Sequence, residues 1–207
     1  MRIALPLSRN VTLAGSSRAL GGTSANSLVE VLLLTACSLF AAMCVVVFEM
    51  KLRMPGHSIM RVIFPVSLGI SLVPRRMVGG LVSFGAVGWL MLFTSWGWGR
   101  PGMGALTSLI LIGPVLDACT WHSQSGWRLY LRCALAGMLT NALAFTVRAG
   151  GKAAGWDAFG MRPLSAWWST AAVTHLAFGL VAGLLCAVLW FRLSTDRTSP
   201  ETPSTSP

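Results

Sequence analysis

Residues 27–48 read SLVEVLLLTACSLFAAMCVVVF, a predominantly apolar run. At 1.5 Å per helical residue this run is about 33 Å long, enough to cross a hydrocarbon core of about 30 Å. A second long apolar run, residues 166–191, has Trp167 and Trp168 at one end and Trp190 at the other. Tryptophan is enriched at both interfaces of a membrane. Both runs therefore predict transmembrane helices.

The composition of the whole chain agrees with this prediction. The 207 residues are 54% hydrophobic and only 11% charged, and the mean hydropathy is +0.68. Soluble globular domains contain about 25% charged residues. A water-soluble enzyme and a free nucleic-acid-binding domain are therefore excluded, and an integral membrane protein is indicated.

Four further apolar segments lie between these two runs. They cover residues 59–73, 77–93, 103–120 and 129–147. The first of them is short and contains Pro65, so it is predicted to be a tilted span or a re-entrant segment. All six segments together predict an all-α fold, a polytopic membrane protein with a six-helix transmembrane bundle.

The chain divides into three parts. Residues 1–26 are rich in Ser, Gly and Ala and carry arginine without acid, so they are predicted to be a flexible basic leader. Residues 27–192 form the six-span transmembrane domain. Residues 193–207 are rich in Ser, Thr and Pro, a composition that cannot bury a core, and are predicted to be a disordered tail.

In a membrane protein, the basic residues are interpreted as determinants of topology. Sixteen Lys and Arg against six Asp and Glu give a net charge of +10, but these residues lie between apolar runs, where they contact lipid headgroups and orient the spans. No nucleic-acid partner is therefore expected. The expected partner of these basic residues is the lipid bilayer. Nine basic residues lie on the side of the termini and seven on the other, a small excess that agrees with cytoplasmic termini.

Polar side chains inside the spans are the first candidates for function. An ionisable group in lipid costs about 2.5–3.5 kcal/mol on the insertion scale and normally faces the bundle interior. His175 and Asn141 lie on adjacent, antiparallel spans and are predicted to fall in the same half of the bilayer. The other candidates in or beside that half are Glu49, His57, Arg61 and Arg148.

Two interpretations of this constellation stay open. The six side chains could line a pocket for a small molecule with acceptor or anionic groups, closed by the Pro55-Gly56 connector. Alternatively, Asn141 and His175 make interhelical hydrogen bonds, each contributing about 0.6–2 kcal/mol. Asp117 lies in the opposite half, where we expect an ion pair with a nearby arginine, or else a role in signalling to a partner.

Motifs for catalysis and metal binding are not found in the sequence. There is no HExxH, no GxSxG and no glycine-rich phosphate loop. The five cysteines include no CxxC pair and have no histidine at ligand spacing. We therefore expect no enzyme activity, no cofactor and no metal site, with an intramembrane enzyme as one open alternative.

Two stretches carry a resemblance to a known family. They are PGHSIMRVIFPVSLGISLVPRR at residues 55–76, and GPVLDACTW followed by GWRLYLRCALAGMLTNALAF within residues 113–145. With six spans, small loops and no nucleotide-binding domain, the chain resembles the S component of an energy-coupling factor transporter. The resemblance implies a substrate-binding subunit for a small molecule such as a vitamin, located in the bacterial inner membrane. It also implies a transmembrane coupling subunit and ATPases encoded elsewhere.

The resemblance further implies roles for particular residues. The family's pocket near the outer surface is closed by the loop after the first helix, which implies a lid at residues 51–58 with His57. In that family, small residues on the first helix contact the coupling subunit. The resemblance therefore implies that Ser38 and Ala42 make this contact. Asp117 is the further candidate for partner coupling. The N-terminal histidine motif of the cobalt and nickel members is absent, so a metal substrate is not implied.

Two other functions remain open at this point. They are a structural or assembly factor for another membrane complex, and a small secondary transporter.

Overall fold

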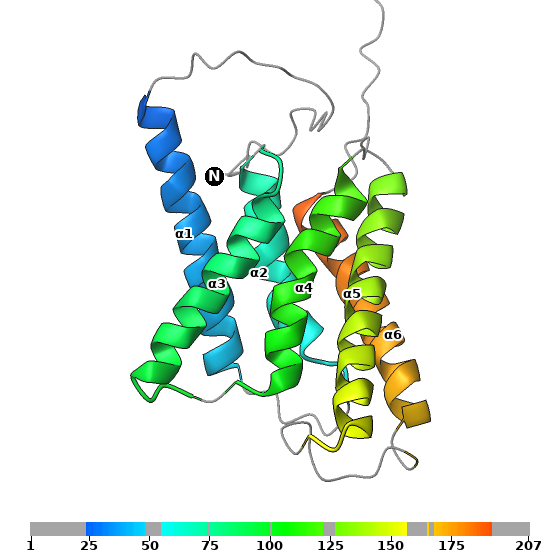
Figure 1. Ribbon diagram of the computed structural model, residues 1–207. Coiled ribbons are helices and arrows are strands. Elements are labelled where there is room, and N and C mark those ends of the chain that lie inside the picture. The colour runs from blue at the N-terminus through cyan, green and yellow to red at the C-terminus, as the bar shows by residue number, and fades with distance from the viewer. Residues whose placement is uncertain are drawn as a thin grey trace, which may run out of the picture.

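The computed structural model describes residues 24–48, 55–73, 75–99, 101–121, 127–156, 165 and 168–191 (Figure 1). The described residues form six helices and no strand, so the all-α prediction is confirmed for them. The helices are α1 (Ser24–Val47), α2 (Ile59–Leu72), α3 (Val78–Ser95), α4 (Met103–Thr120), α5 (Trp127–Ala153) and α6 (Trp168–Trp190). Nearly all of the predicted leader and all of the predicted tail lie outside these residues.

Five of these helices are long and apolar enough to cross a membrane: α1, α3, α4, α5 and α6. They indicate a multi-pass membrane protein. Helix α2 has 14 residues, which corresponds to about 21 Å and is shorter than a hydrocarbon core of about 30 Å. The six-span prediction is therefore confirmed for five helices by length and composition, and α2 is a shorter apolar helix.

Helix α2 lies at the centre of the bundle. It contacts each of the other five helices, and Figure 1 shows it behind α3 and α4. Ile59, Val62 and Ile63 on α2 are fully buried. An apolar helix surrounded by protein on most sides needs no polar face, which explains why its sequence is apolar almost throughout.

Glycines bring α5 and α6 together at close range. A Cβ built on Gly179 would lie 2.5 Å from the carbonyl oxygen of Gly137, and one built on Gly183 would meet the carbonyl of Cys133. Gly179 and Gly183 are four residues apart on α6, the spacing that lets two membrane helices approach backbone to backbone. This contact aligns the halves of α5 and α6 that carry the polar residues.

Small residues also join α1, α3 and α4. A Cβ on Gly79 of α3 would lie 2.7 Å from the carbonyl oxygen of Gly113 on α4, and one on Gly85 would lie 2.6 Å from the Oγ atom of Ser38. Ser38 and Ala42 are both buried, so α1 uses Ser38 to pack against α3 and presents neither residue at the surface. A coupling role for them stays a prediction, and it would require α1 to separate from its neighbours.

Candidate functional site

The short turn formed by residues 55–58 leads into α2, and we call it the entry turn. Gly56 in this turn has a φ of +90°, a value that residues with a Cβ rarely adopt. A Cβ at Gly56 would also lie 2.8 Å from the Cα atom of His175 on α6. Both the backbone conformation and the available space therefore require glycine.

Asn141 connects the entry turn to two helices. Its Nδ2 group donates hydrogen bonds to the carbonyl oxygens of Gly56 at 2.9 Å and of His175 at 2.7 Å. Because both partners can only accept, they determine which end of the amide carries the NH₂ group. The side chain is 0% exposed. One buried amide therefore joins the entry turn, α5 and α6.

The other end of the same amide is its oxygen atom. Asn141 Oδ1 is buried and receives no hydrogen bond from any residue in the described part of the chain. An unsatisfied buried acceptor costs about 1–3 kcal/mol. The site therefore offers a strong acceptor to an N–H or O–H donor.

His175 lies beside this amide on α6. Its exposed fraction is 4%, its Nδ1 atom lies 2.6 Å from the carbonyl oxygen of Ala171, and its ring centroid is 5.5 Å from that of Phe145. Since a carbonyl only accepts, Nδ1 carries the hydrogen in the neutral ring and Nε2 is the acceptor nitrogen. Arg148 and His57 are close enough to interact electrostatically with His175.

Helix α4 also borders the entry turn. Ser58 Oγ lies 3.5 Å from the carbonyl oxygen of Gly104 and 3.5 Å from Ser108 Oγ, both on α4. Together with the contacts of Asn141 and His175, this arrangement places the entry turn against α4, α5 and α6. We call the assembly of the entry turn with Asn141 and His175 the turn junction.

The printed contacts link His57, Asn141, Arg148 and His175 to one another or to the entry turn. Arg61 donates from its NH1 group to the carbonyl oxygen of Phe48 at 2.7 Å, just beyond the end of α1. Glu49 and residues 51–54 of the predicted lid lie outside the described residues.

Asp117 occupies a second polar site at the other end of the bundle. Its carboxylate accepts hydrogen bonds from the backbone N–H groups of Gly79 at 2.9 Å and Gly80 at 2.7 Å. These amides belong to the first turn of α3, which begins at Val78, where unpaired N–H groups and the helix dipole attract a negative charge. Asp117 therefore caps α3 from the neighbouring helix.

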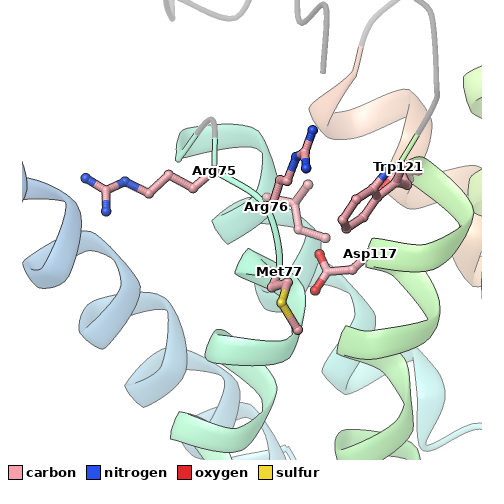
Figure 2. Close-up of a pocket in the computed structure, with 7 residues that line it drawn as sticks. Arg75, Arg76, Met77, Asp117 and Trp121 are labelled. Atoms are coloured by element: carbon pink, nitrogen blue, oxygen red, sulfur yellow. The ribbon is translucent and has the colours of Figure 1, made fainter. Parts of the chain in front are cut away.

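The prediction of an ion pair between Asp117 and an arginine is wrong for the described residues. Arg75 instead pairs with Glu30 of α1, and Figure 2 shows it directed away from Asp117. The Arg76 guanidinium lies 4.8 Å from the centroid of the Trp121 ring. The sequence could not reveal the cap, because it depends on where α3 begins and on which face of α4 meets it.

A hollow of about 30 Å³ lies beside Asp117, between Arg76, Met77 and Trp121 (Figure 2). This volume is comparable to the share of one water molecule in the liquid. Asp117 therefore joins α4 to the start of α3, and the hollow beside it has room for little more than one water.

Comparison of the chain with protein-family models, curated proteins and solved structures finds no match.

Proposed function

We propose that this protein is the membrane-embedded substrate-binding subunit of an importer of the energy-coupling factor type, located in the bacterial inner membrane. It would bind a small molecule such as a vitamin, and a coupling subunit and ATPases on other chains would supply the energy. The resemblance in residues 55–76 and 113–145 supports this proposal, as do the long apolar helices.

The observation that carries the proposal is the turn junction. Asn141 Oδ1 is a buried amide oxygen to which no described residue donates. It lies where the entry turn meets α5 and α6, so movement of that turn would open or close access to it. Arg148 and His57 add positive charge or donors nearby. We therefore propose a ligand with an N–H or O–H donor for Asn141 and an acceptor or anionic group for the basic side chains.

The proposed topology is a six-helix bundle in which α2 crosses as a short sixth span. Both termini would then lie in the cytoplasm and the turn junction would lie in the outer half of the membrane. A single cysteine at Ser199, in a variant without the five native cysteines, tests this orientation. It should not react with a membrane-impermeant maleimide in intact cells and should react after the cells are opened. Labelling in intact cells would contradict the orientation.

Affinity purification from native membranes tests the functional class. We expect ATPases and a second membrane subunit to co-purify with the tagged chain. Recovery of a different membrane complex would favour an assembly factor. Transport by the purified chain alone in vesicles would favour a secondary transporter.

The binding site is tested separately. After native mass spectrometry has identified a co-purifying small molecule, Asn141→Ala and His175→Ala should each weaken its binding by about tenfold or more, as expected when a buried hydrogen bond is lost. Arg128→Gln, at the opposite end of α5, serves as the matched control and should bind normally. If both site variants fold normally and bind the small molecule with unchanged affinity, Asn141 and His175 have a purely structural role.

A further inference from the structure

A groove separate from the turn junction runs between α1 and α2. It encloses about 250 Å³. Apart from one arginine, its walls are apolar side chains and a cysteine. The lining residues are Phe40, Cys44, Phe48, Met60, Arg61, Phe64 and Pro65.

The groove opens toward the surroundings of the bundle. Phe40 is 48% exposed and Phe48 is 58% exposed, so both rings lie at the surface that a transmembrane helix presents to lipid. The two residues are eight positions apart, which corresponds to about 12 Å along a helix axis. The groove therefore extends from the end of α1 into the depth of the membrane.

Arg61 marks the interfacial end of the groove. It lies in the first turn of α2, and its NH1 group donates to the carbonyl oxygen of Phe48, immediately after α1. An arginine at the end of membrane helices lies at headgroup depth.

The shape and charge of the groove define its occupant. One water has a volume of about 30 Å³ and needs two to four polar partners, so apolar walls around about 250 Å³ suit a hydrocarbon chain. A guanidinium at the interfacial end suits a phosphate, with which arginine forms charge-assisted hydrogen bonds. A phospholipid matches both ends, and a net negative headgroup matches the positive charge of Arg61 best.

We propose that this groove binds a phospholipid with an anionic headgroup from the surrounding bilayer. One acyl chain lies along Phe40 and Phe64, and the phosphate lies at Arg61. Asn141 and His175, which the proposed substrate site uses, do not line the groove.

Native mass spectrometry of the purified full chain tests headgroup selectivity. The probes are phosphatidylglycerol and phosphatidylcholine with identical acyl chains. We expect phosphatidylglycerol to bind about fivefold more tightly, the effect of one basic side chain near a membrane surface. Arg61→Gln should abolish this preference, while Arg61→Lys and the matched control Arg128→Gln should retain it. Equal binding of the two lipids, or a preference that survives Arg61→Gln, would overturn the proposal.

Two further measurements test the tail site. Met60→Trp places a larger side chain in the groove and should weaken binding of both lipids by about tenfold while Arg61 remains. Phosphatidylglycerol with a photoreactive group in the acyl chain should crosslink the wild-type chain within residues 40–48 or 60–65. This second measurement does not depend on how the variant folds, and crosslinks confined to other helices would overturn the proposal.

Discussion

The Nδ2 group of Asn141 donates to the carbonyl oxygen of Gly56 at 2.9 Å, across 85 positions of sequence. This bond ties the turn that starts α2 to the middle of α5. Because the same amide also bonds the carbonyl oxygen of His175, a displacement of the turn must disturb both α5 and α6. The bond is therefore a point where the packing of the bundle and access to the proposed ligand site are coupled.

Removing the amide should destabilise the protein. Asn141→Ala loses two hydrogen bonds and leaves two buried carbonyls without this donor, so we expect a loss of about 1–3 kcal/mol in the free energy of unfolding. Asn141→Asp keeps the shape but replaces the NH₂ donor by an oxygen facing two carbonyls, and it should cost at least as much. Reversible unfolding in detergent measures both. An Asn141→Asp variant with an unchanged free energy of unfolding would contradict the observed orientation of the amide.

Substitution at Gly56 should separate backbone strain from steric overlap. Gly56→Ala forces a Cβ into a positive-φ conformation and toward the His175 backbone. The matched control is Gly97→Ala, because Gly97 has a φ of +80° and a Cβ at that position would have no atom within 4 Å. We expect the free energy of unfolding to fall by about 1–2 kcal/mol in the control and by clearly more in Gly56→Ala. Thermal unfolding compares the two, and equal losses would show that the close approach contributes nothing.

The cap of α3 should depend on the carboxylate of Asp117. Asp117→Ala removes the acceptor of two backbone amides and should cost about 1–2 kcal/mol. Asp117→Asn retains one acceptor oxygen but turns an NH₂ donor toward the other backbone N–H, so it should also destabilise the protein. Hydrogen exchange at the amides of Gly79 and Gly80 should accelerate in the alanine variant. Unchanged exchange at these two amides would show that the carboxylate does not cap the helix.

The contact between α5 and α6 should not tolerate a large side chain. Gly179→Leu places its side chain against the backbone of Gly137 and Met138, so we expect the helix pair to separate and the unfolding temperature to fall. Gly88→Leu on α3 is the matched control, because nothing lies within 4 Å of a Cβ there. A cysteine crosslink engineered between α5 and α6 should form less efficiently in Gly179→Leu alone. Equal crosslinking in both variants would contradict the close packing.

Much of the candidate site follows from depth along the helices. Since a helix rises by a constant amount per residue and neighbouring spans alternate in direction, His175 and Asn141 are expected in the same half of the membrane. The contact between Asn141 and the backbone of His175 agrees with that expectation. Depth does not specify rotation about the helix axis, however, and Arg61 lies on the side of α2 that meets α1.

The sequence by itself determined the membrane class and the helices, because the removal of a long apolar segment from water and the need to pair every backbone N–H inside lipid are local requirements. It could not determine which apolar face meets lipid and which meets protein, since both environments favour the same side chains. Only the tertiary structure decided that Asp117 caps α3 instead of pairing with arginine, because the acceptor and the exposed amides lie on different helices. The same holds for Asn141, whose Nδ2 group bonds two other segments while no described residue donates to its Oδ1 atom.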